Sequence, residues 1–415
     1  MTSTLNVEAG TSILSRIITG GLQDPFPLYD ELRELDEGVH WCAELQGWVA
    51  TRVADIRRMG EDPVTYSNAM GAASGATAHD PSDPVQRRYG EVADHFLTFI
   101  DPPEHTRIRS VFRHAFTPKA VDKYRQTAER IADDLLAGYS AGDEVDFMDE
   151  LAAKIPVEVI ATILGVPRSD FALFVEWTDA LTLATDPAVQ GEPRVAAIHT
   201  SVGLLDYLAE IAEHRRKSPQ DDLVSLIVNT PVDGDEPLEP VVAVSQAMLL
   251  LGAGNETTTN LLGNAISILL DRPELQQRLV KDPSLVPQAI EEVLRYDPPF
   301  HFDFRKVTKD HMLGGHEIRA GQPIFHLLAA ANRDPRFFDD PLRFDVDREN
   351  KRHLSFSHGI HRCVGAPLAR MEGAVGLTKI LERFPNISPG STPAQRKVTN
   401  IVARGWETRP VTLLD

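Results

Sequence analysis

The segment FSHGIHRCVGA, Phe356 to Ala366, contains Cys363, one of only two cysteines in a chain of 415 residues. Two glycines flank this cysteine, Gly359 and Gly365, and glycine allows the backbone to turn tightly. A segment with helical periodicity begins after Pro367, LARMEGAVGLTKILERF. The positive N-terminal end of a helix favours thiolate over thiol. The segment therefore predicts a thiolate in a tight loop, with backbone N–H groups that point at the sulfur.

Three roles are open to a cysteine in such a loop. A zinc site needs three or four Cys, His or carboxylate ligands at short spacing, and only His358 and His361 lie close to Cys363. A nucleophilic cysteine needs a base and an oxyanion site, and the sequence identifies neither. A single thiolate can instead bind haem iron as an axial ligand, and Phe356 would then shield the sulfur from water. The loop meets the requirements of this third role.

The composition limits the class of protein. The length and the apolar and charged fractions are those of an ordinary globular chain. Two cysteines cannot build a disulfide framework, so we expect a reducing compartment. The formal net charge of -19 argues against a nucleic-acid partner. The N-terminus lacks a signal-peptide pattern, and no run of about 18 apolar residues occurs. We therefore expect a cytoplasmic protein without a membrane anchor.

Hydrophobic periodicity predicts a mainly α protein with small β-sheets at its margins. Helical spacing recurs over three segments: Tyr124–Leu136, Phe147–Leu164 and Val202–Arg215. Strand-like patterns occur in a hairpin that turns near Gly47 and in three later segments: Val39–Val53, Arg305–Thr308, Gln322–Leu328 and Val398–Ala403. Residues Ala69–Asp83 are rich in Gly, Ala, Ser and Asp, and they predict a long mobile loop.

The longest helical segment, Glu239–Pro273, is apolar at both ends and polar in the middle. Its apolar ends cover nearly every face, so the helix should be buried. The middle contains two glycines and a run of polar residues: Gly252, Gly254, Asn255, Glu256, Thr257, Thr258, Thr259 and Asn260. Glycine together with back-bonding threonine predicts a local distortion that exposes a carbonyl and a hydroxyl to a cavity. The alternative is an ordinary buried helix whose polar groups are satisfied by neighbouring backbone.

The spacing Phe356–x–x–Gly359–x–x–x–Cys363–x–Gly365 resembles that of the cytochrome P450 family. Further segments resemble the same family in the expected order. They are DPPEHTRIR (101–109), a haem-contacting helix start of the soluble bacterial members; AGNETT (253–258), an oxygen-activating helix motif; EVLR (292–295), a Glu–x–x–Arg motif; AANRDP (330–335); and DPLRFDVDR (340–348). The resemblance implies a cytochrome P450 fold, mainly α with small sheets (α+β), in one large haem-binding domain over residues 25–415. Residues 1–24 are then an N-terminal extension.

The resemblance implies haem b as the cofactor, with Cys363 as the iron ligand and Phe356 and Gly365 beside it. Haem propionates need cationic or donor groups in a largely buried pocket. The resemblance points to four such residues: His105, Arg109, Arg305 and His361.

The resemblance also implies a structural cluster. Glu292 and Arg295, one helical turn apart, are expected to be buried and to brace the cysteine loop. Either Arg343 or Arg348 is expected to complete this cluster.

The resemblance implies a monooxygenase in which Glu256 and Thr257 are catalytic. A threonine hydroxyl can hold an ordered water near the bound oxygen, while a neighbouring acid relays protons from solvent. Electrons are expected from a ferredoxin and its reductase, because no flavin or nicotinamide fingerprint follows a strand in this chain. We expect the acidic donor to dock on a local basic patch with five members: Arg107, Arg113, Lys119, Lys123 and Arg362.

The expected substrate is a small, largely apolar organic molecule bound above the haem. The resemblance places the pocket against four segments: Ala69–Phe99, Leu249–Thr257, Phe300–Phe304 and Asn400–Val402. Candidate contacts are Leu249, Ala253, Phe300, His301, Phe302 and Val402. The alternative for the aromatic residues is packing into the core. The sequence does not identify the substrate or the oligomeric state.

Three other functions are open. One is a haem-thiolate sensor or carrier without turnover, and the Glu256–Thr257 pair argues against it. Another is a peroxide-driven haem-thiolate enzyme, but the peroxygenase relatives lack the acid–threonine pair. The last is an unrelated thiol enzyme, which would be colourless when purified.

Overall fold

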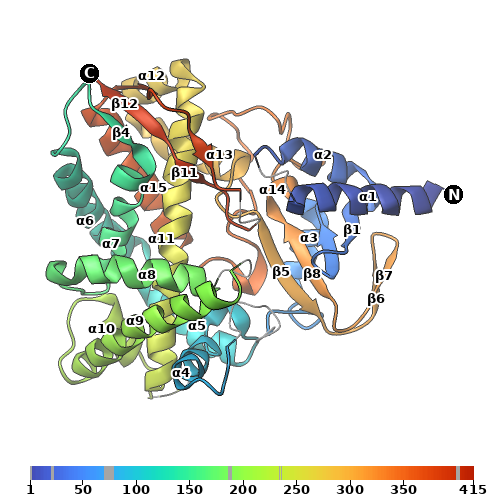
Figure 1. The fold of residues 1–415 in the computed structure, drawn as a ribbon, viewed down its shortest axis with the longest axis horizontal. Coiled ribbons are helices and arrows are strands. Elements are labelled where there is room, and N and C mark those ends of the chain that lie inside the picture. Colours follow the sequence, from blue (N-terminus) through green and yellow to red (C-terminus); the bar gives the residue numbers. More distant parts are fainter. Residues whose placement is uncertain are drawn as a thin grey trace.

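The computed structural model describes residues 2–19, 23–69, 79–185, 189–232, 234, 236–398 and 402–415. A large helical part and a smaller part built on a sheet lie side by side (Figure 1). In chain order, the helices are α1 (Thr2–Thr19), α2 (Phe26–Glu34), α3 (Val53–Glu61), α4 (Pro84–Ala93), α5 (Glu104–Ala115), α6 (Pro118–Leu136), α7 (Lys154–Ile163), α8 (Phe171–Thr185), α9 (Glu192–Lys217), α10 (Leu223–Asn229), α11 (Pro240–Leu270), α12 (Pro273–Lys281), α13 (Val286–Tyr296), α14 (Leu328–Ala331) and α15 (Ala366–Arg383).

The sheets are small, and one of them has five strands in the order β1-β2-β8-β5-β3. The strands are β1 (Val39–Cys42), β2 (Gly47–Ala50), β3 (Tyr66–Ser67), β4 (Glu144–Asp146), β5 (Phe302–Val307), β6 (His311–Leu313), β7 (His316–Ile318), β8 (Pro323–Leu327), β9 (Asn386–Pro389), β10 (Gln395–Arg396), β11 (Trp406–Thr408) and β12 (Pro410–Leu414). The predicted hairpin is confirmed, because β1 pairs antiparallel with β2 and the turn ends at Gly47.

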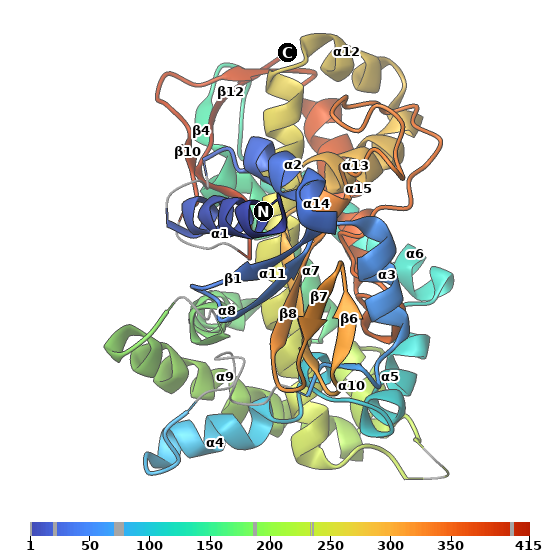
Figure 2. The ribbon, with the colours of Figure 1, turned by 90° about the vertical axis from the view of Figure 1, so that its right-hand side faces the viewer.

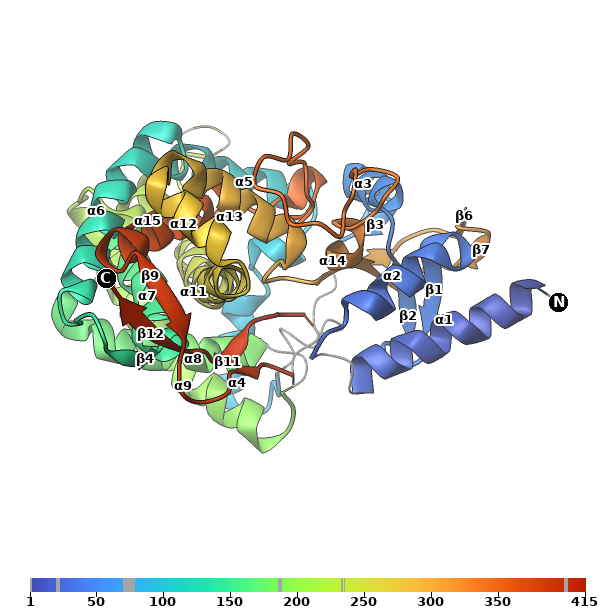
Figure 3. The same cartoon turned by 90° about the horizontal axis from the view of Figure 1, so that it is seen from above.

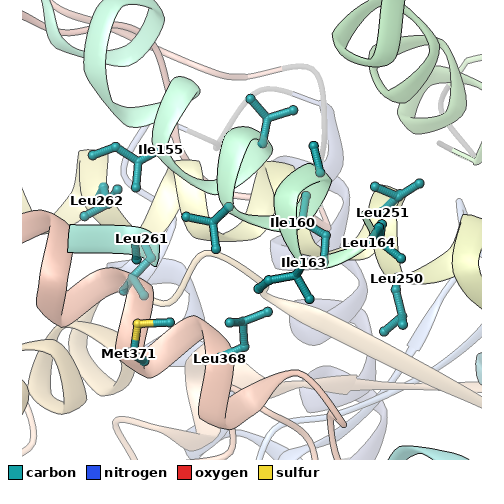
Figure 4. Close-up of a cluster of buried hydrophobic side chains, with 14 of the residues drawn as sticks. Ile155, Ile160, Ile163, Leu164, Leu250, Leu251, Leu261, Leu262, Leu368 and Met371 are labelled. Atoms are coloured by element: carbon teal, nitrogen blue, oxygen red, sulfur yellow. The ribbon is translucent and has the colours of Figure 1, made fainter. Parts of the chain in front are cut away.

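Helix α11 runs through the middle of the helical part, and other helices surround it (Figure 3). Every residue from Thr258 to Leu269 is buried. Leucines of α11 pack against aliphatic side chains of the α7 and α15 segments (Figure 4). The labelled members are Ile155, Ile160, Ile163, Leu164, Leu250, Leu251, Leu261, Leu262, Leu368 and Met371. Burying one such side chain fully stabilises the fold by roughly 1.5–3 kcal/mol, so this packing fixes α11 relative to α15.

The five-stranded sheet has a small core on each face, because side chains alternate along its strands. One core contains Val307 of β5 with residues of α3, and the other contains Phe302 of β5 with residues of α1 and α2. Asp303 and Arg305 therefore share the face of Val307, opposite to Phe302. Figure 2 shows this sheet in front of α11.

The predicted boundary at residue 25 stays a prediction, but α1 is a folded part of the molecule. Its side chains Ile13, Leu14 and Ile17 are buried in one core with Tyr29 and Leu32 of α2.

Three predictions about local structure have different outcomes. Helix α11 continues without interruption through Gly252–Thr257, and Thr257 and Thr259 donate to the carbonyls of Ala253 and Asn255, so the predicted local distortion stays a prediction. The strand Val398–Ala403 is reduced to a bridge between Phe300 and Ala403, and residues 399–401 lie outside the described residues. Residues 70–78 of the predicted loop also lie outside them.

Among the described residues, α9 alone is long and apolar enough to cross a membrane. Its most apolar stretch has a mean hydropathy of 1.3, and 44% of that stretch is buried. The helix packs on α4, α8, α10 and α11. A core helix of a globular protein has the same properties, so α9 is weak evidence for a membrane span.

Glu372 of α15 is a buried carboxyl group beside α11. It is 3% exposed, and Thr258 of α11 donates to it at 3.4 Å. Burial raises the pKa of Glu372 to about 8, while the hydrogen bond from Thr258 acts in the opposite direction. An unfolded glutamate has a pKa of about 4.3, so between these values only the folded protein retains the proton. The stability of the fold therefore falls as the pH rises through this window.

We predict that Glu372→Gln removes this loss, because glutamine has nearly the same shape and does not ionise. As the pH rises, the free energy of unfolding of the variant should increase relative to that of the wild type, by at most about 1.4 kcal/mol per pH unit. Thermal unfolding of both proteins, measured from about pH 5 to about pH 8, checks this. A difference in Tm that stays constant over this range would contradict a neutral Glu372.

Candidate active site

The middle of α11 is accessible, although the rest of the helix is mostly buried. Ala253 is exposed, and Gly252, Gly254, Glu256 and Thr257 are partly exposed. Helix α11 runs through the middle of the helical part (Figure 1; Figure 3), so an accessible stretch on it is a departure from the packing of its neighbours. The predicted cavity at the polar centre of the helix is therefore consistent with the structure, even though the helix is regular.

The cysteine loop is closed by its own backbone and by helix α3. The amide N–H of Cys363 donates to the carbonyl of Phe356 at 2.9 Å. Gly359 has a φ of 79°, which glycine adopts without strain. A Cβ on Gly359 would lie 1.7 Å from the carbonyl oxygen of Gly60 in α3. Glycine is required here both for the turn and for this close contact with α3.

Cys363 is an exposed residue whose thiol is nevertheless desolvated. Burial of the thiol is the main influence on its pKa and raises it. Both observations fit a sulfur that faces an internal cavity. Hydrogen bonds from the backbone N–H groups of Gly365 and Ala366 lower the pKa, as does the charge of Arg109. The loop thus offers the N–H donors that the sequence predicted for a thiolate.

Donor groups for two carboxylates gather next to the cysteine. The rings of His105 and His361 lie 4.2 Å apart, centroid to centroid. Both nitrogens of His105 and Nε2 of His361 are buried without a hydrogen-bond partner. Burial lowers the pKa of His105 to about 4 and that of His361 to about 2. Arg109 and Arg305 are both near enough to His361 to lower its pKa by their charge. Unpartnered buried donors of this kind fit a group that carries carboxylates, as haem does.

The Glu292–Arg295 cluster is buried, and Arg348 completes it. Arg295 donates to both oxygens of Glu292, at 2.7 and 2.8 Å, and Arg348 donates to Glu292 at 3.1 Å. The side chain of Arg343 is 67% exposed and takes no part. Only the carbonyl of Arg343 belongs to the cluster, where it accepts from both arginines. Of the two arginines left open by the sequence, Arg348 completes the cluster and the side chain of Arg343 does not.

The acid and the threonine of α11 have defined partners. Thr257 donates its hydroxyl proton to the carbonyl of Ala253 at 2.9 Å. Because its proton is used in this bond, the Thr257 oxygen can act only as a hydrogen-bond acceptor toward other groups. Glu256 forms an ion pair with Lys397 at 3.2 Å. Burial raises the pKa of Asp179 of α8, which lies near enough to this pair to interact with both charges.

The six predicted substrate contacts are not all in one place. Leu249 and Ala253 lie on the accessible side of α11. The amide of His301 donates to the carbonyl of Val402, and Phe300 forms a bridge with Ala403. Phe300 and Val402 therefore lie close together. These four residues stay candidates for the pocket wall.

His301 and Phe302 are corrected, because the structure shows the alternative, packing into the core. The ring of His301 is 2% exposed and is hydrogen-bonded to the hydroxyl of Tyr29 at 2.9 Å. Phe302 is 1% exposed and belongs to the core formed with α1 and α2. Strand β5 begins at Phe302, and the side chains of His301 and Phe302 both contact Tyr29 of α2.

Known proteins share this arrangement of sequence and fold. A sequence model of the family Cytochrome P450 matches residues 203–405. Cytochrome P450 107B1 of Saccharopolyspora erythraea is 36% identical over 395 residues, which are 94% of this chain and 95% of the relative. The chain belongs to the cytochrome P450 family. Its fold is the P450 fold, and its cofactor is protoporphyrin IX haem iron.

Two further P450 relatives cover nearly the whole chain. The vitamin D(3) 25-hydroxylase of Pseudonocardia autotrophica is 35% identical over 398 residues, 94% of each chain. The crystal structure of P450BioI in complex with an acyl carrier protein ligated to hexadec-9Z-enoic acid has a TM-score of 0.86 at 29% identity. That comparison covers 95% of this chain and 100% of the P450BioI chain. The protein is thus a haem-thiolate monooxygenase of the bacterial P450 type.

Sequence reasoning missed two contacts of this P450 site. One is Lys397, which follows β10 and lies far along the chain from Glu256. The other is the hydrogen bond from Ser357 of the cysteine loop to Asp303 of β5. A basic residue near the C-terminus and an acidic residue beside Arg305 were visible in the sequence, but nothing local indicated their partners.

We predict that Cys363→His abolishes the thiolate-type spectrum even where haem is retained. Imidazole cannot supply the anionic sulfur that the Gly365 and Ala366 amides approach. The measurement is the absorption spectrum of the reduced, carbon monoxide-bound protein, and monooxygenase activity should be lost in parallel. If the variant kept the wild-type spectrum, the assignment of the iron ligand would be wrong.

Proposed function

We propose that this P450 hydroxylates, or otherwise oxidises, a small and largely apolar organic substrate with O2 and two electrons from a ferredoxin-type donor. The observation that carries the proposal is the accessible acid–threonine pair, Glu256 and Thr257, in the middle of a buried helix. We further propose that Cys363 is the axial ligand and that the propionates are held by His105, Arg109, Arg305 and His361. We expect the protein to be cytoplasmic.

The haem, when bound, supplies the activation of O2 and the insertion of one oxygen atom into the substrate, which a thiolate ligand favours. The side chains of this protein position a water molecule and relay protons. The Thr257 oxygen, whose proton is used by the Ala253 carbonyl, can accept a hydrogen bond from a water in the cavity. The Glu256 carboxylate can relay a proton to that water once it separates from Lys397.

The apolar substrate is supported by the side chains that remain candidates for the wall, Leu249, Ala253, Phe300 and Val402. The name of one relative refers to hydroxylation of vitamin D(3), and another relative was crystallised with a carrier-bound fatty acid. We favour a free substrate, because an apolar pocket wall can bind an apolar molecule that carries no charged group and no carrier protein. A screen of free apolar compounds and of their carrier-bound thioesters, read by the spectral shift on loss of the iron-bound water, separates the two.

The peroxide-driven enzyme and the non-catalytic sensor are the competing functions. The Glu256–Thr257 pair argues against both functions. A peroxide-driven enzyme and a sensor do not need residues that deliver protons to oxygen. The deciding experiment reconstitutes the purified protein with a ferredoxin, its reductase and a compound from the screen. Product that forms with reductant and O2, and not with hydrogen peroxide alone, supports the proposal. Substrate-induced spectral shifts without product under either condition would favour the sensor.

We predict that Thr257→Ala retains haem and substrate binding but releases more hydrogen peroxide and less product. Alanine keeps most of the helix surface and removes the one hydroxyl placed to hold the water. Glu256→Gln should instead slow turnover with less leakage, since its defect lies in proton relay. General acid–base assistance is typically worth ~10²–10⁴-fold, which sets the scale for product formation.

Product, peroxide and consumed reductant have to be measured together with one accepted substrate. Thr259→Ala is the matched control, because Thr259 makes the same bond to the backbone but is buried away from the cavity. A Thr257→Ala enzyme that couples as well as the wild type would move this role to Thr258 or to water alone.

Two of the five residues in the predicted basic patch are paired with carboxylates. Arg107 is paired with Glu104 and Glu239, and Lys123 is paired with Asp221. Arg113, Lys119 and Arg362 are exposed. Burial lowers the pKa of Arg109, and the charges of Arg362 and Arg113 lower it further, so these two residues lie near Arg109.

We predict that Arg113→Glu slows electron transfer from an acidic ferredoxin, most strongly at low ionic strength, where charges are least screened. Lys123→Glu is the matched control and should have a smaller effect, because Asp221 already neutralises Lys123. Stopped-flow reduction at several salt concentrations measures both. Equal rates for wild type and Arg113→Glu at every ionic strength would exclude this docking face.

A further inference from the structure

Ser357 of the cysteine loop has a backbone conformation that glycine normally adopts. Its φ is 58°, in the left-handed region. A non-glycine residue is strained there and persists only when its surroundings hold it in place. Two residues later, the same loop uses glycine, Gly359, for its second left-handed position. The turn alone would favour glycine at position 357, so the presence of serine there needs another explanation.

The Ser357 side chain provides that reason, because it joins the cysteine loop to strand β5. Its hydroxyl donates to Oδ2 of Asp303 at 2.5 Å. The other oxygen of Asp303, Oδ1, accepts from the Arg305 guanidinium at 2.6 Å and from the amide of Phe304 at 2.8 Å. Nδ1 of His326 lies 3.9 Å from Oδ2, which is too far for a hydrogen bond. Ser357 is thus the donor to that oxygen.

The carboxylate of Asp303 connects two parts of the site that have to act on one cofactor. Arg305 is 2% exposed and belongs to the propionate donors, whereas Ser357 lies in the loop that ends at Cys363. Buried hydrogen bonds to a charged acceptor are among the stronger ones in proteins.

We propose that Asp303 is a positioning residue that fixes the propionate-binding Arg305 and the cysteine loop relative to each other through Ser357. The left-handed serine is the part of the loop adapted to this contact. The pair would thereby keep Arg305, which would bind a haem carboxylate, and the loop of Cys363, which would bind the iron, in fixed relative positions. The negative charge of Asp303 also lowers the reduction potential of the iron, because it disfavours the added electron.

A double-mutant cycle on the haem-loaded protein tests the contact. The readout is the rate of haem transfer to excess apomyoglobin, which does not depend on catalytic activity. Ser357→Ala should release haem about tenfold faster, the loss expected for one hydrogen bond to a charged group. In an Asp303→Ala background the same change should have little further effect, since its acceptor is already gone.

The matched control is His358→Ala, which removes the neighbouring contact of the loop with Glu61 and does not touch Asp303. His358→Ala should add its own effect unchanged in both backgrounds. If Ser357→Ala were equally harmful with and without Asp303, or harmless in both, the proposal would be overturned.

Asp303→Asn tests the charge and stays available if Asp303→Ala does not fold. Asparagine keeps an acceptor for Ser357 but removes the negative charge, so the iron reduction potential should rise while the Ser357 contact remains. A potential equal to that of the wild type would refute the electrostatic part. The proposal rests on haem ligation by Cys363; a wild type that binds no haem would refute that ligation, whereas a haem-loaded wild type with an uncoupled cycle refutes only the contact.

Discussion

Keeping a sulfur ionisable in the interior is the constraint on which this structure depends. Desolvation of the Cys363 thiol disfavours the thiolate, and backbone amides and the charge of Arg109 act against that effect. Amides can point at the sulfur only if the loop turns tightly, which requires the left-handed Gly359 and its contact with Gly60. A buried cluster, Glu292–Arg295–Arg348, holds the segment that precedes the loop, because its arginines donate to carbonyls of residues 339–343. Each layer of the site thus holds the next in place.

Much of the fold and the centre of the site were predictable from the sequence, because their signals are local. The cysteine loop and the helix after it follow from the spacing of glycine, cysteine and proline. The long apolar helix with a polar middle follows from periodicity, and its accessible stretch is where that polar middle lies. Resemblance to a family then added the fold, the cofactor and the roles of residues that spacing alone leaves open.

The contacts that the sequence did not indicate are long-range pairs. Which arginine meets Glu292 depends on how the segment after α14 folds back, and the choice between Arg343 and Arg348 reverses with a small change in that path. His301 and Phe302 both contact Tyr29 of α2, and nothing in their own stretch of sequence indicates this distant partner. The face of Phe302 is covered by α1, whose sequence gave no reason to expect it there. Lys397 meets Glu256 only because the C-terminal segment returns to α11.

The contact between Gly60 and Gly359 has a consequence for how the molecule can open. At this point two backbones touch without side chains between them, which ties the loop of Cys363 closely to α3. Side chains can repack when an interface slides, whereas touching backbones cannot. Helices α8 and α11 instead meet through a side chain, since Leu181 of α8 lies against Gly252 of α11. An opening that admits a substrate therefore requires less rearrangement between these two helices than between α3 and the cysteine loop.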